Sequence, residues 1–442
     1  MQLQTYDFIA IGLGPFNLSL ACLTEPLTDV NALFLDQVEQ FEWHAGMLLP
    51  NATLQTPFMA DLVTLADPTS PFSFLNYAKT QGRLYSFYIK ESFFLMRNEY
   101  NAYCQWALAQ LSNVRLGNRV ERVEYDAAEA LYLVHSRDLR SGQICTYRAH
   151  KLVLGTGTSP FIPECCRHLG VRARHAASYL RDKASLQRRR SITIIGSGQS
   201  AAEIYYDLLQ DIDRCGYQLN WLTRSPRFYP LEYSKLTLEM TSPDYIDYFH
   251  ALPATKRDQL IRQQHGLYKG INLSLINDIF DLLYNKRLNG DIATRLLTNA
   301  DLRFCHYDEV RDRYDMVLRQ TESGQDYQQQ SEALVLATGY HYQLPEFLAP
   351  IRSRLRWDEK KRLDVARNYS VDHAASEVFV QNVGLYSHGL STPDLGMACY
   401  RNATIVREIT GVEHYAIEQR IAFQQFVLPL GSEVIPEEAR AA

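Results

Sequence analysis

Two glycine-rich turns, each entered from a short apolar run, constrain this chain of 442 residues more than any other feature. Residues 6–11 lead into the first turn and residues 192–195 into the second, and each turn is followed by a helical stretch and another apolar run. The turns read Gly12-Leu13-Gly14-Pro15-Phe16-Asn17 and Gly196-Ser197-Gly198-Gln199-Ser200. In such a unit glycine lets a pyrophosphate approach the backbone, while the helix N-terminus supplies free N–H groups. One turn of this kind is a weak signal, but two in full context predict two dinucleotide-binding units.

The residue that follows the second strand of each unit distinguishes the two nucleotides. Asp36 closes the first unit 24 positions after Gly12, and an acid there binds an unphosphorylated ribose, as in FAD or NAD. The second unit has no acid at that place and ends with Arg224, which suits the 2′-phosphate of NADPH. A solvated surface charge is the alternative interpretation of Arg224.

These patterns predict the residues of two nucleotide sites. The FAD-type site comprises Gly12, Gly14, Pro15, Asn17 and Asp36, and the NADPH-type site comprises Gly196, Ser197, Gly198, Gln199, Ser200 and Arg224. Asn17 departs from the usual fingerprint, because it stands where the third glycine is expected.

An FAD-type site followed by an NADPH-type site resembles the two-dinucleotide-domain flavoproteins. That resemblance implies an α/β fold with two Rossmann-like domains, in which the NADPH domain is inserted into the FAD domain. We expect the FAD domain at 1–165 and 332–442 and the NADPH domain at 166–331. A mostly helical segment at about 255–297 and a C-terminal segment are expected to form a small substrate-binding region.

Composition excludes several functional classes. The formal net charge of -5 leaves no basic footprint for nucleic acid. The start of the chain has no cationic segment before an apolar one, and no apolar run approaches the ~20 residues that span a bilayer. We therefore expect a cytoplasmic protein with no membrane partner. No two histidines have metal-ligand spacing with acid or cysteine partners, so no metal site is predicted.

The cysteine pattern indicates which molecule accepts the electrons of the flavin. The chain has eight cysteines without a Cys-x-x-Cys pair, which form neither a disulfide framework nor a zinc cluster. Flavoprotein disulfide reductases need a cysteine pair soon after the first glycine turn, whereas this chain has only Cys22 before Cys104. Oxygen is therefore the expected electron acceptor.

Several further segments carry a family resemblance. They are Gly12–Leu18, Trp43–Met47, Leu54–Thr56, Asp61–Thr64, Asp67–Phe74, Ala337–Tyr340 and His388–Ser391. Together they resemble the flavin-dependent N-hydroxylating monooxygenases of siderophore biosynthesis, the lysine and ornithine N-monooxygenase family, which has a branch acting on cadaverine and putrescine. The resemblance runs from Tyr6 to about Arg407.

The resemblance implies that NADPH reduces FAD, that O₂ adds to give a flavin hydroperoxide, and that its distal oxygen passes to a primary amine. NADP⁺ is then expected to stay bound, and no acid–base triad is needed. By the same resemblance Trp43, His44 and Met47 line the FAD and Gln55 faces the flavin. The structural alternative is that Trp43 and Met47 belong to the core and that His44 is a buried histidine. The resemblance also implies a homo-oligomer, without marking an interface.

Three departures from the family pattern bear on the substrate. Ala60 replaces a lysine that the amino-acid-specific members place near the substrate head group, and Leu267 replaces an asparagine of the ornithine enzymes. A Leu-Leu-Ser stretch becomes Asp394-Leu395-Gly396. A buried α-carboxylate without a cation would cost several kcal/mol, so the substrate pocket around Ala60, Leu267, Asp394 and Gly396 favours cadaverine or putrescine.

Alternatives remain at this point. Lys269 or a nearby arginine could replace the lost cation, which would keep L-lysine or L-ornithine as the substrate, and Asp394, Asp61 or backbone carbonyls could receive the second ammonium of a diamine. A monooxygenase of another branch is disfavoured, because no Phe-x-Gly-x-x-x-His stretch lies between the two nucleotide sites. A non-catalytic flavin-binding protein would keep the same motifs.

Overall fold

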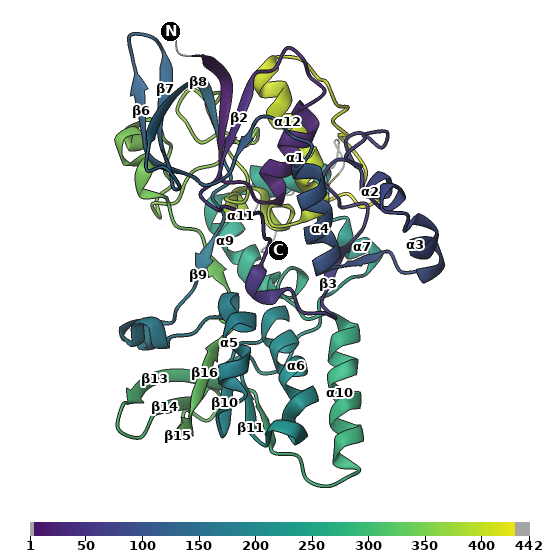
Figure 1. The fold of residues 1–442 in the computed structure, drawn as a ribbon, viewed down its shortest axis with the longest axis vertical. Helices are drawn as coiled ribbons and strands as arrows, with labels where there is room; N and C mark the ends of the chain where they lie inside the picture. The colour runs from purple at the N-terminus through teal and green to yellow at the C-terminus, as the bar shows by residue number, and fades with distance from the viewer. Residues whose placement is uncertain (1–3, 429–442) are drawn as a thin grey trace, which may run out of the picture.

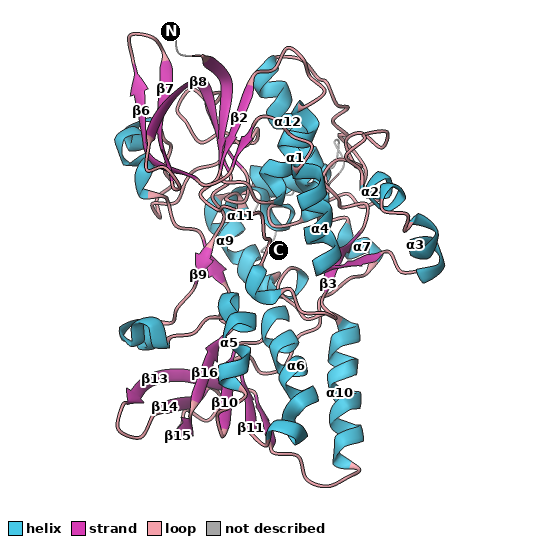
Figure 2. Ribbon diagram, in the orientation of Figure 1, coloured by secondary structure: helices cyan, strands magenta, loops and turns pink. Residues whose placement is uncertain are grey.

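The computed structural model of the protein describes residues 4–428. Figure 1 shows two α/β units one above the other, with the first strands and the C-terminal helix in the upper unit and the middle of the chain in the lower one. Figure 2 shows that each unit has its own sheet, with helices packed beside it.

The sheet of the upper unit has seven strands within the described residues, in the order β5-β2-β1-β8-β7-β6, with β18 also paired to β8. These are β1 (Thr5–Ile11), β2 (Ala32–Leu35), β5 (Val114–Arg115), β6 (Asn118–Asp126), β7 (Leu131–Asp138), β8 (Ile144–Leu154) and β18 (Val378–Val380). β1 pairs in parallel with β2 and β8, whereas β6, β7 and the first half of β8 form an antiparallel meander. Because β18 pairs with residues 152–154, segments far apart in the sequence complete one sheet.

The sheet of the lower unit is fully parallel, in the order β12-β11-β10-β16. Its strands are β10 (Ser191–Ile195), β11 (Gln218–Leu222), β12 (Thr294–Leu297) and β16 (Ala333–Leu336). The antiparallel strands β13 (Ala300–Asp308), β14 (Arg313–Gln320) and β15 (Asp326–Ser331) form a separate meander. The central strands β1 and β10 are mostly apolar and mostly buried, as expected for parallel strands that are covered on both faces.

The two units are joined by a pair of short strands. β9 (Ser159–Pro160) leads into the lower unit, β17 (Tyr340–His341) leads out of it, and the two pair antiparallel. Another two-stranded pair, β3 (Thr53–Pro57) with β4 (Phe94–Met96), lies in the upper unit. The entry and the exit of the inserted unit are therefore side by side.

Helices cover the sheets and fill the space between the units. The α-helices are α1 (Pro15–Thr24), α2 (Phe74–Thr80), α3 (Leu84–Lys90), α4 (Arg97–Leu108), α5 (Tyr179–Leu186), α6 (Gln199–Cys215), α7 (Lys235–Leu238), α8 (Pro243–Ala251), α9 (Ala254–Gln263), α10 (Leu273–Arg287), α11 (Leu385–His388) and α12 (Ala398–Thr410). Short 3₁₀ turns are η1 (Ala45–Met47), η2 (Glu164–Arg172), η3 (Ala176–Ser178), η4 (His265–Leu267), η5 (Glu346–Arg354), η6 (Gly389–Ser391) and η7 (Leu395–Met397). None of the helices in the described part has the length and apolar character of a bilayer-spanning segment.

The helical segment between β11 and β12 touches both units. Tyr245 and Phe249 of α8 and Ile261 of α9 form an apolar cluster with Leu385 of the C-terminal part. In contrast, Ile279 of α10 belongs to the core of the lower unit. The segment therefore forms a wall across the junction of the two units.

One predicted boundary needs correction. The division at 331/332 is too early, because Ala333–Leu336 pairs with β10 and belongs to the sheet of the lower unit. The cause is that a short apolar run does not reveal which strand it will pair with. The segment at about 255–297 is mostly helical and ends in the edge strand β12.

Candidate functional site

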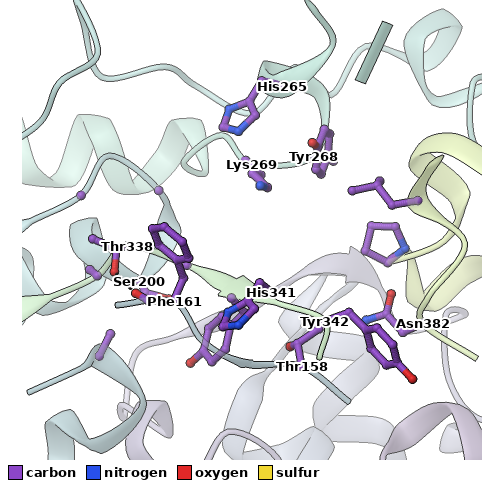
Figure 3. A pocket seen from close by; sticks show the side chains of 18 of the residues that line it. Thr158, Phe161, Ser200, His265, Tyr268, Lys269, Thr338, His341, Tyr342 and Asn382 are labelled. Atoms are coloured by element: carbon purple, nitrogen blue, oxygen red, sulfur yellow. Dashed lines mark hydrogen bonds between the residues drawn. The ribbon is translucent and has the colours of Figure 1, made fainter. Parts of the chain in front are cut away.

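A cavity of about 1500 Å³ lies between the two units. Residues from both glycine turns line it, together with the loop after α9 and segments on either side of β17. In Figure 3, His265, Tyr268 and Lys269 stand on one wall and face Phe161, Thr338 and His341 on the other. A single cavity reached by both turns is the arrangement that two cofactors in contact require.

The first turn has the geometry of a phosphate cradle. Gly12 has a φ of +88°, and a Cβ there would stand 2.5 Å from the carbonyl oxygen of Gly155. Gly14 precedes α1 as its N-cap without a side-chain cap, and no atom lies within 4 Å of the place where its Cβ would stand. Open space over unpaired N–H groups of the first helical turn suits a pyrophosphate.

Asn17 explains why the missing third glycine does not disrupt this turn. Its Nδ2 donates to the Gly12 carbonyl at 2.6 Å, and its Oδ1 accepts from Nε2 of Gln381 at 3.0 Å. A Cβ on Gly155 would lie only 2.3 Å from that Nδ2. The glycine that permits close packing has therefore moved from the helix to the end of β8.

Asp36 lies beside the same turn, immediately after β2. One carboxylate oxygen accepts from the backbone N–H of Leu13 at 2.5 Å and the other from that of Val38 at 2.9 Å. The acid is thus fixed at the place where the ribose of a dinucleotide lies in this kind of unit.

The second turn repeats the pattern at the start of α6. Gly196 has a φ of +145°, and a Cβ there would approach the carbonyl oxygen of Ala337 to 2.2 Å. Gly198 is the N-cap of α6 and again lacks a side-chain cap. Arg224 follows β11 and lines the same cavity. The whole predicted NADPH set, Gly196, Ser197, Gly198, Gln199, Ser200 and Arg224, lines this cavity.

The residues assigned to the FAD by family resemblance separate into two groups. Trp43, His44 and Gln55 line the cavity, as does Pro15 of the first turn, whereas Met47 is 2% exposed and packs into the apolar core of the lower unit. The packing of Met47 therefore favours a role in the core over a role in binding FAD. Burial, followed by the charge of Arg97, lowers the pKa of His44 to about 4, so its imidazole is neutral near pH 7.

Gln55 connects the two units at the cavity. Its Nε2 donates to Oδ1 of Asn272 at 3.0 Å and to the carbonyl of Gly270 at 3.3 Å. Oε1 of Gln199, from the second turn, accepts from the backbone N–H of Asn272 at 2.8 Å. Gln55 from β3 and Gln199 from the second turn thus both bind the loop after η4.

An ion pair that the sequence did not reveal joins the same units. Both Nη atoms of Arg97, at the start of α4, donate to the carboxylate of Glu203 in α6, at 2.7 and 2.8 Å. Nη1 of Arg97 also donates to the Met47 carbonyl, and Nε2 of Gln199 donates to Glu203 at 2.9 Å. The Glu203 side chain is 4% exposed. No sequence signal pairs residues 106 positions apart, so only the fold could identify this contact.

Two of the predicted substrate residues meet next to this cavity. The Cβ of Ala60 lies 3.9 Å from the place where a Cβ on Gly396 would stand. Asp394 lies two residues away, with Oδ1 accepting from the Gly396 N–H at 2.7 Å. Ala60, Leu267, Asp394 and Gly396 are not among the cavity-lining residues, although Tyr268, Pro393 and Leu395 are. Burial raises the pKa of the Asp394 carboxyl, while Gly396 and Arg401 oppose that effect.

The structure distinguishes between the acids considered for a second ammonium. Asp61 is 2% exposed, and its two oxygens accept from the backbone N–H groups of Val63, Thr64 and Phe74 and from the Thr64 hydroxyl. It shapes its own loop and has little capacity left for a ligand. Among the described residues, Asp394 has only one oxygen bonded, to the Gly396 N–H, so it is the acid near Ala60 that can still bind a ligand.

Arg401 is a second feature that sequence reasoning missed. It is 1% exposed, and its Nη2 donates to the carbonyls of Ser391 and Thr392 at 3.2 and 2.7 Å. Its guanidinium lies 4.7 Å from the ring of Phe16, beside the first turn. This buried cation fixes the loop that carries Asp394.

Buried polar atoms test whether the site fits a flavin cofactor. The Oγ1 atoms of Thr56 and Thr392 and the Oε1 of Gln381 have no hydrogen-bond partner among the described residues. Thr56 adjoins Gln55, and Thr392 adjoins the cavity-lining Pro393. Buried groups of this kind call for a polar partner, and with the open space over Gly14 they fit a dinucleotide. No cluster of histidine, cysteine and acidic residues in the described part could hold a metal ion.

Comparison with known proteins identifies relatives over nearly the whole chain. The chain is 56% identical over 421 residues to a putrescine N-hydroxylase of Shewanella oneidensis, which covers 95% of this chain and 84% of the relative. It is 58% identical to the crystal structure of a cadaverine monooxygenase of the desferrioxamine pathway from Erwinia amylovora, bound to FAD, with a TM-score of 0.95 over 98% of this chain and 100% of that one.

A more distant structure adds the second nucleotide. An ornithine N-hydroxylase of Kutzneria, solved with reduced FAD, NADP⁺ and L-ornithine, is 25% identical with a TM-score of 0.83, over 92% of this chain and 99% of that one. The family model of L-lysine 6-monooxygenase/L-ornithine 5-monooxygenase matches residues 4–342. With two nucleotide turns at one cavity and relatives that share the complete fold, this chain belongs to the L-lysine 6-monooxygenase/L-ornithine 5-monooxygenase family.

Proposed function

We propose that this protein hydroxylates one terminal amine of a diamine, cadaverine or putrescine, with FAD, NADPH and O₂, for hydroxamate siderophore biosynthesis. The observation that carries the substrate assignment is the neighbourhood of Ala60, Gly396 and Asp394. Ala60 supplies no cation there, and the nearby buried Arg401 is bonded to the carbonyls of Ser391 and Thr392. Asp394 is an acid that a second ammonium could use. Relatives named for putrescine and cadaverine, at 56% and 58% identity, support the same assignment.

The charges at this place favour a diamine over an amino acid. Burial already disfavours the charged form of Asp394, so an α-carboxylate near Ala60 would place a second desolvated acid beside it. The ammonium at the far end of a diamine would instead relieve the desolvation of Asp394. The same argument disfavours L-lysine and L-ornithine, whose carboxylate would find no lysine at position 60.

The chain's own residues would place the cofactors. The N-terminus of α1, with Asp36 and Asn17 beside it, would hold the FAD dinucleotide, and the N-terminus of α6, with Arg224, would hold NADPH. The reduced flavin supplies the activation of O₂. Trp43, His44 and Gln55 line the cavity in which both cofactors would meet the amine and exclude water from it.

The reacting amine must be neutral to act as a nucleophile. An alkyl ammonium has a pKa near 10.4, and a shift of about three units corresponds to roughly 4 kcal/mol of desolvation or nearby positive charge. The neutral His44 imidazole leaves this part of the cavity without an added charge.

A substrate panel tests the proposal. FAD-loaded protein is supplied with NADPH and one amine at a time (cadaverine, putrescine, L-lysine, L-ornithine or pentylamine), and hydroxylamine formation is compared with NADPH consumption. We expect efficient coupled turnover with the diamines, slower turnover of pentylamine, and none of L-lysine or L-ornithine. Coupled turnover of L-lysine would refute the substrate assignment and keep the family, whereas no hydroxylamine from any amine would favour the non-catalytic alternative.

The role of Asp394 can be tested separately. Asp394→Asn keeps the shape of the side chain and removes its charge, so the KM for cadaverine should rise about tenfold or more, because a charge-assisted contact is lost. The KM for pentylamine, which has no second ammonium, should stay unchanged. Asp364→Asn, at another acid that lines the cavity, is the matched control, and equal effects of the two variants would argue against a specific role.

We further propose a cytoplasmic location. All eight cysteines lie in the described part of the chain and are free thiols, the state that a reducing compartment maintains.

We also propose that the protein forms a homo-oligomer. Light scattering of the holoenzyme would test this prediction.

A further inference from the structure

Three cationic or protonatable side chains converge on one corner of the cavity. Arg224 follows β11, and His265 and Lys269 come from η4 and the loop after it; we call these three residues the cationic corner. All three line the cavity, and Figure 3 shows Lys269 directed into it beside His265 and Tyr268. Residues from two separate elements thus bring two cations and one imidazole to one place.

The backbone fixes this corner over the second glycine turn. The carbonyl oxygen of Lys269 lies 3.7 Å from the place where a Cβ on Gly198 would stand. The N–H of Lys269 donates to the His265 carbonyl at 3.0 Å, and its ammonium lies 5.3 Å from the centre of the Tyr268 ring. The cationic side chains are therefore held next to a turn that is built to receive phosphate.

Within the described residues no carboxylate forms an ion pair with Arg224, His265 or Lys269. The pKa of Lys269 is lowered by partial burial and then by Arg224, and no carboxylate acts in the opposite direction. The pKa of His265 is lowered by burial, then by Lys269 and by Arg224. Mutual repulsion of like charges beside a ligand cavity is relieved when an anion binds between them.

We propose that Lys269 and His265 join Arg224 in one binding site for the 2′-phosphate of NADPH, so that the helical segment between β11 and β12 selects the phosphorylated nucleotide. In a unit of this kind the adenosine ribose lies at the end of the second strand, where Arg224 stands. The phosphate would be held from the sheet side by Arg224 and from the opposite wall by Lys269 and His265.

This inference rests on the proposed use of NADPH, and it changes the interpretation of Lys269. That lysine was one candidate to replace the cation lost at Ala60, which would have kept an amino acid as the substrate. Its backbone lies against Gly198 and its ammonium is within the influence of the Arg224 charge, so its charge serves the nucleotide instead. The amine site near Asp394 then has no cation to offer from this loop.

Binding of nucleotide fragments tests the site without turnover. FAD-loaded protein is titrated in a calorimeter with 2′,5′-ADP, which carries the ribose phosphate, and with 5′-ADP, which does not. Lys269→Met should weaken 2′,5′-ADP about tenfold or more and change 5′-ADP less than twofold, because one charged contact to the phosphate is lost. His265→Gln should weaken 2′,5′-ADP about threefold, and Lys269→Arg should retain most of the affinity.

Lys361→Met is the matched control, since Lys361 lines the same cavity in a different segment, and it should change neither affinity. Equal weakening of both fragments by Lys269→Met would overturn the proposal in favour of a pyrophosphate contact. Unchanged affinity for 2′,5′-ADP with a raised KM for the amine would place Lys269 in the amine site. Neither fragment requires an amine substrate, so failure of the diamine proposal would leave these results intact.

Discussion

The two glycine turns share one local geometry and differ in what surrounds them. At the first turn the chain's own side chains enclose the loop: Asn17 is fully buried and bonded to Gly12, and Asp36 accepts from Leu13. At the second turn every residue from Gly196 to Ser200 lines the cavity, with the cationic corner beside it.

This difference matches what each cofactor must do. A flavin that remains through many turnovers benefits from a turn that is part of the protein core, whereas a nicotinamide nucleotide that brings electrons must enter and leave. The same strand–turn–helix pattern therefore serves a resident or an exchanging ligand, depending on what packs around it. The comparison yields predictions for each turn.

The largest effect is expected at Gly196. An alanine there would combine an unfavourable φ of +145° with a Cβ 2.2 Å from a backbone carbonyl, which should lower the free energy of unfolding by about 4 kcal/mol or more. Gly14→Ala is the contrast, because its Cβ meets open space; it should keep the stability of the protein and reduce FAD binding by filling the phosphate cradle. Denaturant unfolding and flavin content measure the two effects. A stable Gly196→Ala protein would contradict the geometry.

The ion pair between the units should give the next effect. Arg97→Met leaves the buried Glu203 carboxylate without its bidentate partner, and loss of one partner of a buried pair costs about 3 kcal/mol. Arg190→Met, which breaks the pair with Glu332 while its own side chain is 91% exposed, should cost less than about 1 kcal/mol. Equal unfolding free energies for the two variants would show that the Arg97–Glu203 pair does not hold the units together.

A smaller effect separates the two turns at equivalent positions. Asn17 and Ala201 both stand three residues after the second glycine of their turns. Asn17→Gly should cost about 2 kcal/mol, because the hydrogen bonds with Gly12 and Gln381 are lost. Ala201→Gly should cost about 1 kcal/mol or less, the ordinary effect of glycine in a helix. If both substitutions cost the same, the first turn is no more enclosed than the second.

The smallest expected effect is a pH dependence of stability in the upper unit. His388 is fully buried, between the ring of Tyr369 and that of His250, and burial holds its pKa well below the ordinary 6.5. Folding favours the neutral form, so its contribution to stability is complete above pH 6.5 and is lost as the pH falls below 6.5. At pH 5.5 the stability lost amounts to about 1.4 kcal/mol. Unfolding curves at pH 7.5 and 5.5 should differ less for His388→Gln, and an unchanged difference would assign the acid sensitivity elsewhere.

Much of the fold followed from local sequence patterns. The apolar runs before the two glycine turns form β1 and β10. Asp36, the acid that follows β2, lies where an acid that binds ribose is expected. These features are encoded by neighbouring residues, so periodicity and glycine placement suffice. The compensation between Asn17 and Gly155 could not be predicted, because it depends on how closely α1 approaches the end of β8.

The site was predicted less completely, for a related reason. Met47, expected at the flavin, instead fills the core of the lower unit, since an apolar side chain gives the same signal in a core as beside a cofactor. The contact of Arg97 with Glu203 and the position of Lys269 over Gly198 join distant parts of the chain. Such contacts are set by the tertiary fold and leave no trace in residue spacing.

The pairing of β9 with β17 has a consequence for how such a protein can be rebuilt. Because Ser159 and His341 are partners across that pair, the ends of the inserted unit already lie together, and a loop that starts and finishes at one point does not strain its host. A short turn from Ser159 to His341 would remove the entire lower unit and leave β1, β2, β8 and β18 paired as they are. The lower unit could therefore be exchanged for that of a relative, which would change the nucleotide that the protein uses as reductant.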